Sequence, residues 1–185
     1  MKFFCCGILT ALLFPPFFLF PLGFILLPYL FSLISKDTIT SKSKISHFVF
    51  GFFYGFGLSF VILIWIKEPF LLNVTTANFS YISYLLVVYV SIYFGFSFLF
   101  LSFFKKKFSK YILLPVFFLI AEILRENLFF GFPWITFALV SSSNIFFLNI
   151  SYYIGTNGLS LITLYIFLIP TSLLALISNN KDIYY

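Results

Sequence analysis

Charged side chains are scarce in this sequence of 185 residues. Asp, Glu, Lys and Arg together make up 9% of it, whereas 62% is hydrophobic and 32 residues are Phe. The apolar surface of such a chain is far larger than its few polar groups could cover in water, which excludes a water-soluble globular domain. We therefore expect lipid to be the solvent of this protein.

Histidine and cysteine are also nearly absent. His47 is the only histidine, and no Asp, Glu or Cys lies close to it in the sequence. The two cysteines, Cys5 and Cys6, are adjacent, which suits neither a disulfide nor a metal site without further ligands. The chain contains no Ser-His-Asp or Cys-His set and no phosphate-binding glycine loop. We therefore predict no catalytic residues, no metal site and no cofactor in this chain.

The positions of the lysines explain the net charge of +6 without a nucleic-acid partner. They fall in short gaps between apolar runs, three of them within residues 35–44 and four within residues 105–110. The positive-inside effect places basic residues of membrane proteins in such gaps. No basic stripe lies on a face that could fold in water, so we predict no binding of nucleic acid.

Six apolar segments predict an all-α, polytopic transmembrane helical bundle that forms one domain over residues 1–185. The third has twenty-two residues, about 33 Å of helix at 1.5 Å per residue, which is enough to cross the core of a bilayer. The first is short for a span and ends at Pro15 and Pro16, which a helix does not pass easily. The six segments cover residues 3–14, 17–34, 45–66, 81–104, 111–130 and 152–177.

The distribution of basic residues between these segments predicts their orientation. The N-terminus, residues 35–44, residues 105–110 and the C-terminal tail carry Lys, whereas the intervening connections carry almost no net basic charge. We therefore expect both termini to be cytoplasmic. Residues 131–151 are expected to form a non-helical or interfacial passage on the opposite side of the membrane.

The fifth segment contains three charged side chains, Glu122, Arg125 and Glu126. A charge at the centre of a bilayer costs about 2.5–3.5 kcal/mol or more, so charged residues inside spans are candidate functional sites. Their spacing places them on one helical face, and we expect Arg125 to fork onto either carboxylate. One interpretation is a structural ion-pair cluster that points into the bundle. The other is a face that meets a polar substrate group or a catalytic partner.

The tetrapeptide Gly131-Phe132-Pro133-Trp134 is expected to end that helix, because Gly is a common helix stop and Pro prevents simple continuation. Trp at headgroup depth is typical of an interfacial anchor. Its closeness to the charged face also allows a rim that contacts lipid or peptide.

Gly51, Gly55 and Gly57 lie in the third segment. Small residues four positions apart let membrane helices approach closely, so we predict that these glycines serve helix packing.

Four stretches, taken in order, resemble the N-terminal membrane part of apolipoprotein N-acyltransferase. The most specific is residues 121–134, where Glu122-Ile-Leu-Arg125 and Gly131-Phe-Pro-Trp134 are similar to the family's E-x-L-R and GFPW signature. The other three are the proline-containing break at 13–24, the glycine-rich stretch 51–66 with its terminal Trp, and Gly-Thr-Asn-Gly-Leu-Ser at 155–160.

The resemblance implies an enzyme of the bacterial inner membrane that transfers an acyl chain from a phospholipid to the N-terminal cysteine of a lipoprotein. In that family a periplasmic nitrilase-like domain supplies a Glu-Lys-Cys catalytic set. This sequence stops after its sixth apolar segment, so we expect that set to be missing. The chain is then the membrane domain, or a truncated form, of such an enzyme. The expected partners are phospholipid, the lipoprotein substrate and a nitrilase-like catalytic domain acting in trans.

Glu122, Arg125, Phe132, Pro133 and Trp134 match the family motif, and the resemblance implies that they lie at the periplasmic side of the membrane. We hypothesise that Arg125 and the neighbouring rim receive a headgroup phosphate. The substrate- or lipid-facing candidates are Glu122, Arg125, Glu126, Phe132, Pro133 and Trp134.

Two alternatives remain open from the sequence. The chain is a non-catalytic membrane scaffold for a separately encoded nitrilase-like subunit, or it is a small transporter. A transporter predicts charged groups from more than one helix that converge in mid-membrane, whereas the charges here concentrate in one segment.

Overall fold

The computed structural model describes residues 1–40, 43–128 and 131–177, and these residues contain helices, turns and no β-strand. This confirms the all-α prediction. The α-helices are α1 (Lys2–Ala11), α2 (Gly23–Thr40), α3 (Lys44–Leu63), α4 (Lys67–Leu71), α5 (Ile82–Leu101), α6 (Lys107–Asn127), α7 (Ala138–Ser141) and α8 (Ile145–Ile177). Short 3-10 turns occur at Phe20–Leu22, Ile64–Ile66 and Ala77–Phe79.

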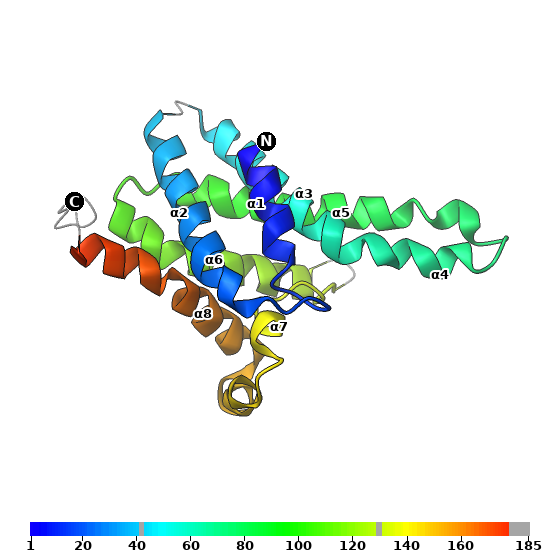
Figure 1. Ribbon diagram of the computed structural model, residues 1–185. Coiled ribbons are helices and arrows are strands. Elements are labelled where there is room, and N and C mark those ends of the chain that lie inside the picture. The colour runs from blue at the N-terminus through cyan, green and yellow to red at the C-terminus, as the bar shows by residue number, and fades with distance from the viewer. Residues whose placement is uncertain (41–42, 129–130, 178–185) are drawn as a thin grey trace.

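The longer helices form one bundle from which two parts project (Figure 1). One projection is the far end of the α3–α5 hairpin, which carries α4. The other contains α7 and the first part of α8. The N-terminus, the start of α3 and the α5–α6 connection lie toward the opposite, upper-left end of the view. The ammonium of Lys44, the first residue of α3, lies 3.9 Å from the ring centroid of Phe103, so the start of α3 contacts the α5–α6 connection.

Three helical stretches of the described chain are long and apolar enough to cross a membrane, namely Lys44–Leu71, Ala77–Leu101 and Ile145–Leu173. Of the other predicted spans, α1 has only ten residues, about 15 Å of helix, because the chain turns at Pro15 and Pro16. The helix α6 has 21 residues, but its last turns carry the three charges. Six spans and the orientation of the termini therefore remain predictions.

Several predicted boundaries were wrong. The helix α2 extends to Thr40, beyond the predicted end at residue 34, and α4 lies in the gap between the segments 45–66 and 81–104. The sixth segment begins at Ile145 rather than near residue 152. Gly155 interrupts it with φ 72° and ψ 175°, a backbone conformation that glycine adopts without strain.

The helices α3 and α5 pack along one another, with glycines at their contacts. A Cβ at Gly51 would lie 2.3 Å from the carbonyl oxygen of Phe94, and one at Gly55 would lie 2.8 Å from the Phe94 Cβ. A Cβ at Gly57 would lie 2.3 Å from the carbonyl oxygen of Phe4 in α1. These distances support the packing role expected for the three glycines, because helix backbones touch where side chains are smallest.

An aromatic cluster fills the space where α3, α5 and α6 meet. The Phe118 ring lies in its middle, with ring centroids 5.9 Å from Tyr54, 5.3 Å from Phe94 and 5.7 Å from Phe137. Phe137 belongs to the non-helical passage after α6, so this cluster joins that passage to the helices.

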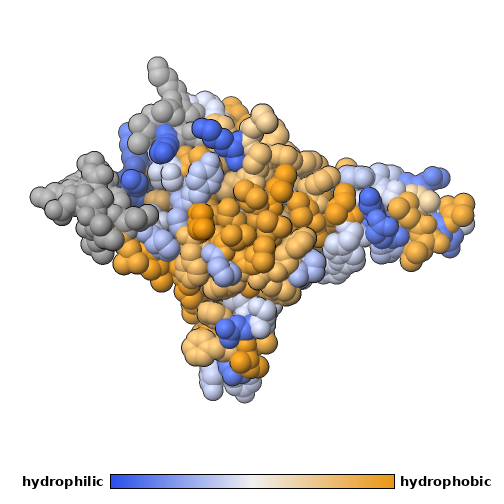
Figure 2. Space-filling model, viewed as in Figure 1, coloured by the Kyte–Doolittle hydropathy of each residue, from blue (hydrophilic) through white to orange (hydrophobic). Residues whose placement is uncertain are grey.

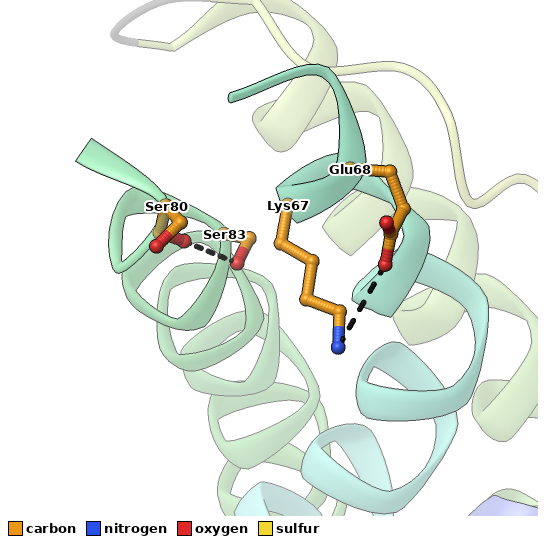
Figure 3. Close-up of polar contacts among 4 residues, drawn as sticks. All are labelled: Lys67, Glu68, Ser80 and Ser83. Atoms are coloured by element: carbon orange, nitrogen blue, oxygen red, sulfur yellow. Dashed lines mark hydrogen bonds and ion pairs between the residues drawn. The ribbon is translucent and has the colours of Figure 1, made fainter. Parts of the chain in front are cut away.

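The distribution of hydrophobic and hydrophilic residues differs between the bundle and its two projections. In Figure 2 the body of the bundle is largely hydrophobic, and hydrophilic residues gather near the upper left and on the two projections. On the α4 projection, Lys67 and Glu68 form an ion pair at 3.8 Å, and the Ser83 hydroxyl donates to the Ser80 carbonyl at 2.7 Å (Figure 3). This polar end suits an aqueous or interfacial environment.

Candidate functional site

Two buried charged side chains of α6 form hydrogen bonds with the non-helical passage at residues 131–137, which follows this helix. Arg125 is 0% exposed and Glu122 is 3% exposed. The Nε of Arg125 donates to the Phe132 carbonyl at 3.1 Å, and its Nη2 donates to the Ile135 carbonyl. The Oε1 of Glu122 accepts the backbone N–H of Phe137 at 2.8 Å. One helix face thus supplies both a donor and an acceptor for a stretch without helical hydrogen bonds.

The expectation that Arg125 forks onto a carboxylate was wrong. In the described part of the chain, no ion pair joins Arg125 to either Glu122 or Glu126, whereas Lys67 and Glu68 do form one. The physical reason is the passage itself. In a membrane interior, non-helical backbone must find partners within the protein, and a planar guanidinium reaches two carbonyl oxygens at once.

The structure divides the six candidates between the interior and the rim. Glu122 and Arg125 lie inside the bundle, as in the first of the two interpretations, and their polar atoms bind the passage. Glu126 and Phe132 are half-buried, whereas Pro133 and Trp134 are exposed. A substrate contact for any of the six remains a prediction.

Three aromatic rings stack along this rim. The Trp65 and Trp134 ring centroids are 5.2 Å apart with an interplanar angle of 13°. The Phe132 ring lies 5.6 Å from Trp134 at 24°. Trp65 comes from the 3-10 turn after α3, so the stack joins the end of α3 to the passage.

Beside the stack lies a cavity of about 750 Å³. It is bounded by the turn at Pro15 and Pro16, by the end of α3 with Trp65, and by the passage with Pro133 and Trp134. Among the described residues that line it, none has a titratable side chain, and Thr136 carries the hydroxyl group. The cavity can therefore hold an apolar chain, but its own lining offers no acid, base or nucleophile.

A second link runs from the passage to α8. The backbone N–H of Ala138 donates to the Ser160 hydroxyl at 2.9 Å, and the hydroxyls of Ser141 and Thr163 lie 3.0 Å apart. Ser160 closes the Gly-Thr-Asn-Gly-Leu-Ser stretch noted in the sequence. Its role is to position α7 against α8.

Sequence reasoning missed part of this site. The sequence marks Trp65 only as the Trp near the end of the glycine-rich stretch 51–66, and Pro15 and Pro16 as a break between helices. Both lie in stretches that carry the family resemblance, which was the available signal. These residues line one cavity with Trp134 although their segments are far apart in the chain, and no local spacing reveals this arrangement.

The arrangement of charges bears on the transporter alternative. In the part of the chain that the structure describes, the buried Lys, Arg and Glu side chains are Lys110, Glu122 and Arg125, all from α6. No group of three or more His, Cys, Asp or Glu residues in that part of the chain could hold a metal ion. The convergence of charges from several helices that a transporter predicts is not observed there.

Comparison with known families agrees with this geometry. A family model described as the apolipoprotein N-acyltransferase N-terminal domain matches residues 6–169. The chain belongs to this family. The matched range of the apolipoprotein N-acyltransferase N-terminal domain includes every segment that bounds the cavity, together with α6 and Ser160. A search of curated proteins found no match to the chain.

Proposed function

We propose that the chain is the membrane part of an apolipoprotein N-acyltransferase and that its cavity receives an acyl chain of the substrate. The phospholipid donor and the lipoprotein acceptor both carry such chains. One observation supports this proposal most strongly. Three segments that resemble family motifs, far apart in the sequence, meet around a single apolar cavity beside the stacked Trp65 and Trp134.

The size of the cavity suits this occupant. A water molecule occupies about 30 Å³ of liquid, and a methylene group is of similar size. A space of about 750 Å³ therefore holds on the order of 25 such groups. This is room for one acyl chain together with part of a glycerol backbone.

The candidate residues take different parts in this proposal. Pro133 and Trp134 form the exposed rim, where they contact the substrate, and Phe132 extends the stack behind them. Arg125 and Glu122 act as positioning residues, because they hold the backbone of the passage that carries the rim. Headgroup binding by Arg125 is not part of the proposal, since its side chain is fully buried.

Membership of this family supports a proposal for the environment and the partners of the protein. We propose that the protein lies in the bacterial inner membrane with both termini in the cytoplasm, so that the passage and its cavity face outward. A nitrilase-like catalytic domain with a Glu-Lys-Cys set would work above this face. The alternative of a non-catalytic scaffold differs only in that the nitrilase-like domain is a separate polypeptide.

The two tryptophans provide the test, because they are the only ones in the sequence and both lie at the cavity. Their fluorescence is recorded while a phospholipid brominated in its acyl chains is titrated into the detergent-solubilised protein. We expect saturable quenching at low ratios of lipid to protein. The unbrominated lipid is the control, and Trp134→Phe and Trp65→Phe report each ring separately. Quenching that rises only in proportion to bulk lipid would contradict the proposal.

A further inference from the structure

The helix α8 is longer than a membrane crossing requires. Twenty-two of its residues follow Gly155, which makes about 33 Å of helix and is enough for the core of a bilayer. Residues 145–154, which precede Gly155, are therefore not needed to cross the membrane.

Gly155 turns these ten residues away from the axis of the rest of α8. Its φ of 72° and ψ of 175° fall in a backbone region that is open essentially to glycine alone. A Cβ at this position would meet nothing within 4 Å, so the backbone angles, and not crowding, call for glycine. In Figure 1 the first part of α8 is seen nearly end-on at the bottom of the picture, whereas the rest of the helix runs obliquely to the upper left.

The side chains of residues 145–154 are mostly apolar and exposed. Phe147 and Ile150 are half-buried, and the Phe147 ring lies 5.9 Å from that of Phe20, so this face meets the body of the protein. The hydrophilic residues of this projection in Figure 2 are all uncharged, because residues 135–177 contain no Asp, Glu, Lys or Arg. Exposed apolar surface of this kind marks a contact with a membrane or with a partner. The exposed side chains are Ile145, Phe146, Leu148, Asn149, Tyr152, Tyr153 and Ile154.

The tyrosines and their surroundings favour the membrane. Tyr152 and Tyr153 are 86% and 84% exposed, and their rings pack edge to face with centroids 5.2 Å apart. Tyr is enriched where a bilayer meets water, because its ring is apolar and its hydroxyl stays hydrated. A surface for a soluble partner would also carry a polar rim, and here Asn149 is the one exposed amide. The exposed apolar surface continues along the spanning part of α8 at Ile162 and Ile169.

We propose that residues 145–154 form an interfacial helix, which lies along the boundary between the headgroups and the acyl chains of the bilayer. Helices of this type bury their apolar side chains about 5–10 Å into that boundary. Because these ten residues carry no charge, the contact is with the bilayer surface in general and not with a particular headgroup. The inference does not rest on acyl transfer, and it holds whichever side of the membrane the passage faces.

The interfacial helix is connected to two walls of the cavity. Its start follows α7, which is joined through the passage to Pro133 and Trp134. Phe20, which its Phe147 ring contacts, lies shortly after Pro15 and Pro16, which bound the cavity on another side. The depth of this helix in the bilayer therefore sets the depth of the cavity rim.

The test measures the depth of nitroxide spin labels on single cysteines. The full chain, with Cys5 and Cys6 replaced by Ser, is reconstituted into phosphatidylcholine bilayers and labelled at Ile145→Cys or Tyr152→Cys. Collisions with oxygen, which concentrates in the bilayer, and with a water-soluble nickel chelate give the depth of each label. We expect nearly the same depth at the two positions, because both lie on one side of a helix parallel to the surface. A helix that continued the span would separate them by about 10 Å over seven residues.

Ile162→Cys is the matched control, because it is exposed on the same helix and lies seven residues beyond Gly155. Its label should lie about 10 Å deeper than the other two. Labels at Ile145→Cys and Tyr152→Cys that collide mainly with the nickel chelate would reveal a surface in water, suited to a soluble partner. That result, or a depth difference of about 10 Å between these two labels, would overturn the proposal.

A second measurement repeats the series in bilayers that contain phosphatidylglycerol. The depths should not change, since an uncharged helix gains nothing from an anionic surface. A shift seen only with phosphatidylglycerol would reveal recognition of one headgroup and would contradict the contact proposed here. None of these outcomes affects the tryptophan quenching at the cavity, so the two proposals can fail separately.

Discussion

Replacement of Arg125 by Met should destabilise the protein more than any other single change in α6. The side chain is fully buried and donates to two backbone carbonyls, those of Phe132 and Ile135. Each hydrogen bond from a charged group contributes about 1.5–3 kcal/mol. The two buried carbonyls then lack this donor, at about 1–3 kcal/mol each, whereas methionine avoids the cost of burying a charge, so we expect a net loss of about 2–5 kcal/mol.

Arg125→Lys should fall between the wild type and Arg125→Met. The lysine ammonium keeps the charge, but it lacks the planar fork that reaches two carbonyl oxygens. Glu126→Gln is the matched control, because Glu126 is half-buried in the same turn and forms no ion pair with Arg125. We expect this control to change stability by less than about 1 kcal/mol.

The free energy of unfolding is measured by titrating a denaturing detergent into mixed micelles. Tryptophan emission is recorded in the folded state as well, because Trp134 lies in the passage that Arg125 holds. Arg125→Met should shift this emission, whereas Glu126→Gln should not. If Arg125→Met and Glu126→Gln proved equally stable, the positioning role of Arg125 would be refuted.

Three further changes probe the fold around the site. Gly57→Ala places a Cβ 2.3 Å from the Phe4 carbonyl oxygen, so thermal unfolding in detergent should reveal a loss of about 1–3 kcal/mol or more. Ser160→Ala removes the acceptor of the α7 amide, and the buried N–H left behind should cost about 1–3 kcal/mol in the same assay. Lys67→Ala breaks the partly exposed pair with Glu68, and unfolding should change by less than about 1 kcal/mol, since surface pairs contribute little.

Helices could be predicted from the sequence because their signals are local. Long apolar runs predicted α3 and α5 to within a few residues, and Pro15 and Pro16 predicted the end of α1. The error at α8 arose because Asn149 and Ser151 made residues 145–151 resemble a connection. Residues 145–151 are helical although they contain these polar side chains, and α8 is interrupted at Gly155 instead.

The candidate site was harder to predict because its contacts are not local. The spacing of Glu122, Arg125 and Glu126 correctly indicates one helical face, and side-chain pairing is the natural expectation for it. The actual partners are backbone groups of residues 132–137, which became available because Pro133 prevents a helix there. Backbone N–H and C=O groups that lack helical partners in an apolar interior bind the same charged side chains that could otherwise pair with each other. The spacing of residues in a sequence does not reveal this.

The most direct test asks whether the passage that forms the cavity rim faces outward. Ser143 is exposed and lies in the turn after α7, nine residues beyond Trp134, so a single cysteine at this position, with Cys5 and Cys6 replaced by Ser, reports the side of the membrane on which this region lies. We expect a membrane-impermeant maleimide to label Ser143→Cys in cells whose inner membrane is intact, whereas Lys105→Cys should react only after that membrane is opened. The opposite pattern would place the cavity in the cytoplasm and contradict a role in acyl transfer at the outer face.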